Sequence, residues 1–147
     1  MHLRDPSGLL PIVGKVSTNL LTGAVVMPNT GHYKTTTSSS GAITSVEIAK
    51  QYREDLLQNT TSGFDPMMTL TFGPDLNASE VEAAKTFGIV GIKWYPAGGT
   101  VNADARSGNI SLDPQDARFE AMEKNDMPFL IHAQRPLIRD KNGEVLE

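Results

Sequence analysis

The sequence contains no cysteine among its 147 residues. This excludes a disulfide framework and any thiolate metal site, so a bound metal would need nitrogen and oxygen ligands. Long apolar runs are also missing. The early run GLLPIVG at 8–14 contains Pro11 and follows Arg4 and Asp5, which suits neither a signal peptide nor a membrane-spanning helix. We therefore expect a cytoplasmic protein.

Positive charge is scarce as well. The chain has 13 lysines and arginines against 17 acidic residues, which gives a net charge of −4. It therefore presents no basic field for the phosphates of a nucleic acid or for an anionic membrane surface. The hydrophobic share of 39% and the charged share of 20% are ordinary for a globular domain, so we expect one domain with a core of its own.

Short apolar runs alternate with amphipathic segments along most of the chain. The apolar runs predict buried parallel strands at 1–4, 23–30, 65–73, 89–96 and 127–133. The amphipathic segments predict helices at 46–59, after a Ser45 cap, at about 79–88, opened by Asn77 or Ser79 and stopped by Gly88, and at 114–126, with Pro114 in the first helical position. Strands separated by helices at this spacing indicate βαβ units and an α/β fold with a parallel sheet.

Polar residues of chemical interest follow these strands where they end. They are His2, Arg4, Asn29, Lys93, Tyr95 and His132. In parallel α/β folds the functional site lies at the carboxyl ends of the strands, so these side chains are expected to converge. Taken singly, each has a structural explanation: a hydrogen-bonded core histidine, a lysine whose head reaches water, a turn asparagine or a surface arginine.

Lys93 is unusual because it stands in an apolar run, and lysine is rarely buried without a partner. An amine that reacts with carbon dioxide becomes a carbamate, an anionic ligand that can bridge two divalent cations beside imidazole nitrogens. A hydroxide held between such cations can attack an amide carbonyl at neutral pH. The pattern therefore favours a metal-dependent hydrolase.

Four motifs, in this order and spacing, resemble the single-domain bacterial dihydroorotases of the amidohydrolase superfamily. They are HLRD at 2–5, VVMPNT at 25–30, KWYPAGGTVN at 93–102 and MPFLIH at 127–132. The resemblance implies part of a (β/α)₈ TIM barrel that interconverts N-carbamoyl-aspartate and dihydroorotate in pyrimidine biosynthesis. It also implies two zinc ions bridged by a carboxylated lysine.

Site roles follow from the resemblance residue by residue. Lys93 matches the carboxylated lysine, and His2 and His132 match metal ligands. Arg4 and Asn29 match the groups that hold the substrate carboxylate. Thr100 lies where the family places a substrate-covering loop, although Val101 replaces a threonine commonly found there.

The chain also departs from the family pattern. It begins inside the His-x-His motif and ends soon after the fifth strand, so the first histidine, the sixth-strand histidine and the eighth-strand aspartate are not among its residues. Ala133 and Gln134 replace a usual Gly-Glu, and the polar segment 31–44, with His32 expected at the surface, resembles an insertion. A complete barrel needs about 250 residues. We therefore interpret 1–147 as a single incomplete barrel segment, truncated and inactive alone.

An alternative function stays open, in which a repurposed half-barrel has a binding or structural role. Five strands of a barrel would leave unpaired edges and apolar surface, so we expect a homo-oligomer or a partner chain. With few metal ligands present, we expect Lys93 to be unmodified, free of zinc, and exposed at the open side of the half-barrel.

Overall fold

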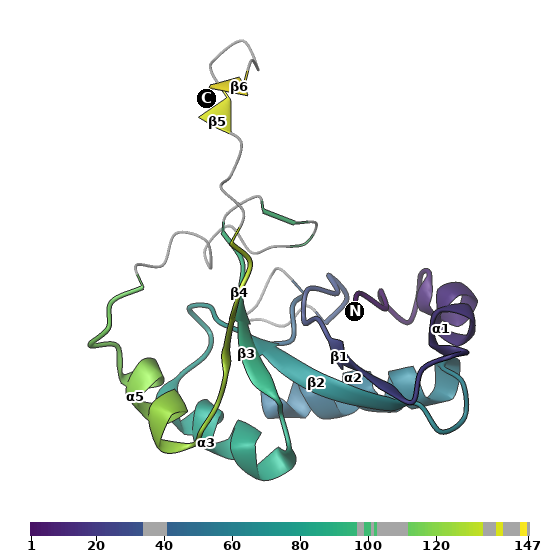
Figure 1. The fold of residues 1–147 in the computed structure, drawn as a ribbon, viewed down its shortest axis with the longest axis horizontal. Coiled ribbons are helices and arrows are strands. Elements are labelled where there is room, and N and C mark those ends of the chain that lie inside the picture. Colours follow the sequence, from purple (N-terminus) through teal and green to yellow (C-terminus); the bar gives the residue numbers. More distant parts are fainter. Residues whose placement is uncertain are drawn as a thin grey trace.

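The structure is a computed structural model that describes residues 1–33, 41–96, 99–100, 102, 112–133, 138–139 and 145–146. Its main sheet contains four parallel strands in the order β1-β2-β3-β4. These strands are β1 Gly23–Val26, β2 Asp65–Thr71, β3 Gly91–Trp94 and β4 Phe129–Ile131. The helices between them are α2 Val46–Asn59, α3 Ala78–Phe87 and α5 Ala117–Lys124, and they lie along one side of the curved sheet (Figure 1). The expected α/β fold, a partial barrel, is confirmed.

Three further elements flank this half-barrel in sequence. Helix α1, Leu10–Thr18, precedes β1, and the short antiparallel strands β5, Ile138–Arg139, and β6, Val145–Leu146, form a separate pair. Helix α1 packs closely on the end of α2, since a Cβ at Gly14 would lie 2.3 Å from the Asn59 carbonyl oxygen. Within the described part of the chain, no helix combines the length and apolar character needed to cross a bilayer.

The two faces of the sheet differ in chemistry because side chains alternate along each strand. One face packs against the helices and carries the core residues Val26, Met68, Leu70, Phe72 and Ile92. The other face carries Thr69, Thr71 and Lys93, and Thr71 pairs directly with Lys93 in the register of β2 and β3. The concave side of the half-barrel is therefore polar toward the carboxyl ends of the strands.

Helix ends follow the capping residues that the sequence predicts. The Ser45 side chain accepts a hydrogen bond from the Ile48 amide at the start of α2, and Asn77 accepts one from the Glu80 amide at the start of α3. Gly88 ends α3 in the left-handed conformation, with φ of 93°, which glycine adopts without strain. The predictions for Ser45 and Gly88 are confirmed, and of the two residues expected to open α3, Asn77 rather than Ser79 is the cap.

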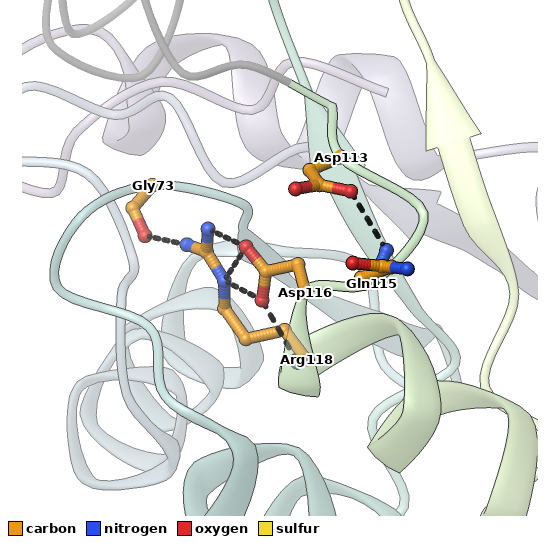
Figure 2. Close-up of polar contacts among 5 residues, drawn as sticks. All are labelled: Gly73, Asp113, Gln115, Asp116 and Arg118. Atoms are coloured by element: carbon orange, nitrogen blue, oxygen red, sulfur yellow. Dashed lines mark hydrogen bonds and ion pairs between the residues drawn. The ribbon is translucent and has the colours of Figure 1, made fainter.

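The prediction that the last helix begins at Pro114 is wrong. Residues 114 and 115 form a turn in which Asp113 accepts a hydrogen bond from the Gln115 amide at 2.9 Å. Helix α5 begins after Asp116, whose carboxylate accepts from the Arg118 amide at 2.9 Å and also pairs with the Arg118 guanidinium (Figure 2). These hydrogen bonds from Arg118 lower the pKa of Asp116. Asp116, rather than Asp113, therefore caps the helix, and it also forms an ion pair with Arg118.

Arg118 should matter for stability, because it links α5 to the loop after β2. Its guanidinium donates to the Gly73 carbonyl at 2.7 Å and lies 4.2 Å from the centre of the Phe72 ring. We expect Arg118→Gln to lower the free energy of unfolding by about 1–3 kcal/mol, measured by urea denaturation. Lys124→Gln is the matched control: it removes an exposed ion pair with Glu120 and should change stability little. Equal losses in both variants would contradict this assignment.

The segment 1–4, expected as a strand, is not assigned as one. The Met1 amine donates to the Val25 carbonyl at 2.5 Å, and the Met27 amide donates to the Met1 carbonyl at 2.9 Å. The segment thus runs beside β1 for a single residue, and Arg4, with φ of 71°, then turns the backbone away from an extended path. The described main sheet therefore has four strands rather than five.

The flanks of the expected insertion at 31–44 join the sheet, although residues 34–40 lie outside the described residues. The Ile43 amide donates to the Pro28 carbonyl at 2.8 Å, and the Thr71 amide donates to the Ile43 carbonyl at 2.8 Å. Ile43 therefore joins the chain just after β1 to the end of β2. His32 is exposed, as the sequence predicts.

Candidate functional site

Asn29 connects the polar residues at the strand ends. It follows β1 and is almost fully buried. Its side-chain oxygen accepts a hydrogen bond from the Tyr95 hydroxyl at 3.0 Å, and its amide nitrogen lies 3.5 Å from the Thr100 hydroxyl. A hydrogen bond also joins Asn29 to His2. The site therefore begins as a network that spans the start of the chain, β1 and the segment after β3.

Lys93 lies beside this network and is 6% exposed, so the expectation that it is exposed is wrong. Its side chain shares a face with its register partners on the two flanking strands, Thr71 on β2 and Leu130 on β4. Its Nζ lies 4.6 Å from the centre of the Tyr95 ring. Burial lowers the pKa of Lys93, because the charged amine is less well solvated there.

His132 follows β4 and approaches the same tyrosine. The ring centres of Tyr95 and His132 are 5.6 Å apart, and the His132 amide extends the ladder by donating to the Trp94 carbonyl at 3.1 Å. Burial raises the pKa of Tyr95, so its hydroxyl stays protonated and serves as a donor to Asn29. Tyr95 therefore contacts Asn29, Lys93 and His132.

His2 lies at the exposed margin of the site. Partial burial is the largest cause that lowers the pKa of His2, and the positive charge of the chain's N-terminus lowers it further. The hydrogen bond with Asn29 acts in the opposite direction. His2 is therefore mostly neutral at pH 7, which is the form of imidazole that binds a metal.

A cavity of about 200 Å³ opens between the start of the chain and the end of β1. It is lined by His2, Arg4, Asn29, Thr30 and Asn102, among others. The backbone of Arg4 is fixed because the Tyr52 hydroxyl donates to its carbonyl at 2.8 Å. The cavity thus combines a cationic guanidinium with amide and hydroxyl groups, which are suited to bind a carboxylate.

The structure brings the predicted residues together to different degrees. His2, Asn29 and Thr100 are linked through hydrogen bonds, Lys93 and His132 join them through Tyr95, and Arg4 lines the adjoining cavity. The sequence did not single out Asn102, whose side chain donates to the Thr30 carbonyl at 3.1 Å. No local pattern indicates that contact.

Any metal at this site would have an unusual donor set. Among the described residues, no group of three or more histidines, cysteines or acidic residues lies close enough to hold a metal ion. The available donors are the imidazoles of His2 and His132 and the side chain of Lys93. Such a set could bind metal only if the lysine became an anionic ligand or further ligands were added.

Four parallel strands with helices between them, and a polar site at the carboxyl ends of the strands, are the arrangement of a partial (β/α)₈ barrel. No protein-family model matches the chain. The dihydroorotase of Methylobacillus flagellatus is 39% identical over 91% of the chain, and that of Synechocystis is 33% identical over all of it. The crystal structure of the Campylobacter jejuni dihydroorotase superimposes with a TM-score of 0.75 at 30% identity, covering 93% of the chain.

The chain is therefore dihydroorotase-like over nearly all of its length. It spans 36% and 40% of the length of the Methylobacillus and Synechocystis relatives, and 37% of the Campylobacter structure. A dihydroorotase structure from Saccharomyces cerevisiae, solved with 5-fluoroorotic acid, matches with a TM-score of 0.71 at 25% identity.

Proposed function

We propose that the chain provides part of the active site of a cytoplasmic dihydroorotase, which interconverts N-carbamoyl-aspartate and dihydroorotate in pyrimidine biosynthesis. The observation that supports this best is the network of His2, Asn29, Tyr95, Lys93 and His132. Asn29, Lys93, Tyr95 and His132 lie at or just after the ends of three strands, and His2 lies at the start of the chain beside β1, in a fold similar to dihydroorotases. The reaction class is therefore hydrolysis of a cyclic amide.

In this proposal His2, Lys93 and His132 would hold zinc. Burial favours the neutral amine of Lys93, the form that reacts with carbon dioxide to give a carbamate ligand. The mostly neutral imidazole of His2 is also in the form that binds zinc. These three residues alone are too few to complete a tetrahedral zinc site. Bound zinc would supply a hydroxide that is nucleophilic at neutral pH.

The residues of this chain have a second task in the proposal, to orient the substrate. Arg4 would pair with the substrate carboxylate across the cavity, because a guanidinium can donate two parallel hydrogen bonds to it. Asn29 and Thr100 would donate further hydrogen bonds. Tyr95 fixes the orientation of Asn29 by donating to its side-chain oxygen, so the amide nitrogen faces Thr100.

Substrate binding can be tested on the chain itself. We expect N-carbamoyl-aspartate to shift the NMR signals of residues around the cavity, and Arg4→Gln to weaken binding by about tenfold or more. Arg53→Gln is the matched control, since Arg53 pairs with Asp65 at the opposite end of β2. Unchanged affinity in Arg4→Gln, or no binding by the unmodified chain, would contradict the proposed function.

A second function has a specific observation in its favour. Helix α1 and its flanks expose apolar side chains that are spaced along the helix. They are Leu9, Ile12, Val16 and Leu20. A surface of this kind favours association with another polypeptide, as a half-barrel with a binding or structural role would require.

A further inference from the structure

The Thr71 hydroxyl is buried without a hydrogen-bond partner. Thr71 is 3% exposed, and its Oγ1 is the one such side-chain atom among the described residues. A buried hydroxyl that makes no hydrogen bond lowers stability, because it loses its contact with water and gains nothing in return. An unsatisfied group of this kind therefore calls for an explanation.

Thr69 shows that the same face of β2 can satisfy a threonine. Its hydroxyl donates to the Val26 carbonyl at 2.5 Å, on the neighbouring strand. Thr71, two residues further along, lies on the same face at the end of the strand and makes no such bond. The unpaired hydroxyl of Thr71 therefore lies at the carboxyl end of β2, the end of the sheet where the candidate site lies.

The cross-strand neighbour of Thr71 is Lys93. Adjacent strands lie about 4.8 Å apart, so the two side chains extend from neighbouring positions on the same face. Lys93 makes no hydrogen bond to the Thr71 hydroxyl, and its Nζ lies over the Tyr95 ring instead. An ammonium group offers donors only, whereas a carbamate would extend the side chain and present two acceptor oxygens.

We infer that Thr71 is a positioning residue whose hydroxyl donates a hydrogen bond to a carbamate oxygen on Lys93. The inference rests on the proposed function and adds a residue to it. The unprotonated Nζ attacks the carbon of carbon dioxide, an N–C bond forms as one C–O π bond opens, and an amine proton leaves to solvent. Thr71 then stabilises the anion, since hydrogen bonds to charged groups are the stronger ones.

The test follows carbamate formation directly by NMR with ¹³C-labelled bicarbonate at high concentration. The Lys93 carbamate signal is assigned by its loss in Lys93→Arg. We expect Thr71→Val to raise the bicarbonate concentration for half-maximal signal by about tenfold or more, with Thr71→Ser restoring most of the loss. Thr69→Val, on the same face, is the matched control and should leave the signal unchanged.

Thermal unfolding separates this role from a structural one. Thr71→Val should have an unchanged or higher Tm, because it removes an unpaired buried hydroxyl, while Thr69→Val should have a lower Tm. A carbamate signal that is the same in Thr71→Val overturns the inference and leaves the proposed function standing. Absence of the Lys93 signal in the unmodified chain overturns both the inference and the lysine chemistry on which it rests.

Discussion

The purified 147-residue polypeptide is expected to hydrolyse dihydroorotate at no measurable rate, even with added zinc and bicarbonate. The resemblance implies a further histidine ligand on the sixth strand and an aspartate general base on the eighth. The 147 residues of this polypeptide include neither of them. Without the base, a metal-bound water would also lack a group to accept its proton. Loss of dihydroorotate should be followed directly, and turnover of about 1–1,000 per second would contradict this expectation.

As purified, before any zinc or bicarbonate is added, the polypeptide should be free of zinc and carry an unmodified Lys93. His2 and His132 can give each metal position only one imidazole, which is too few to hold an ion firmly. Intact mass in bicarbonate-free buffer and elemental analysis measure both properties. The matching positive experiment joins residues 1–133 to the segments of the Methylobacillus relative that precede and follow the matched region. These segments would add the first-strand histidine, the sixth-strand histidine and the eighth-strand aspartate that the resemblance implies, and this chimera should regain hydrolysis. A chimera that folds and binds zinc but does not hydrolyse dihydroorotate would contradict the proposed function.

Much of the fold could be predicted because its signals are local. Ser45 and Gly88 mark helix ends through their own backbone preferences, and the apolar runs at β1 to β4 mark strands that are covered on a face. The start of α5 could not be predicted in this way. Asp113 and Asp116 both suit a helix cap, and the choice depends on the contacts of Arg118 with Gly73 and Phe72.

The sequence could predict which residues gather at the candidate site, but not how they contact one another there. Asn29, Lys93 and His132 could be named because each follows a strand, and parallel strands bring their carboxyl ends together. The burial of Lys93 and the central place of Tyr95 depend on contacts between strands that are distant in sequence. The missing partner of Thr71 is also a tertiary property, since Thr69 and Thr71 look alike in sequence.

The polypeptide should not be a free monomer, and the exposed stripe on α1 gives the reason. Ile12 and Val16 on α1 and Leu20 just beyond its end are 68%, 80% and 92% exposed, and the spacing of Ile12 and Val16 places them on one side of the helix. Isolated apolar residues at a surface are normal, but a contiguous stripe favours association. We expect a second copy to cover it, with the two α1 helices packed against each other.

Light scattering at micromolar concentration should therefore show a dimer or a larger species. The double variant Ile12→Glu, Val16→Glu should shift the population toward monomer with an unchanged far-UV spectrum, because charged side chains would have to be buried in the helix pair. Leu57→Glu is the matched control, since Leu57 is also exposed, at 46%, but lies on α2. A clean monomer in the unmodified protein would contradict the prediction. If the double variant remains a dimer, the interface is not on α1. It would then lie at the open edge of the sheet, where unpaired backbone groups can pair with the strand of another chain.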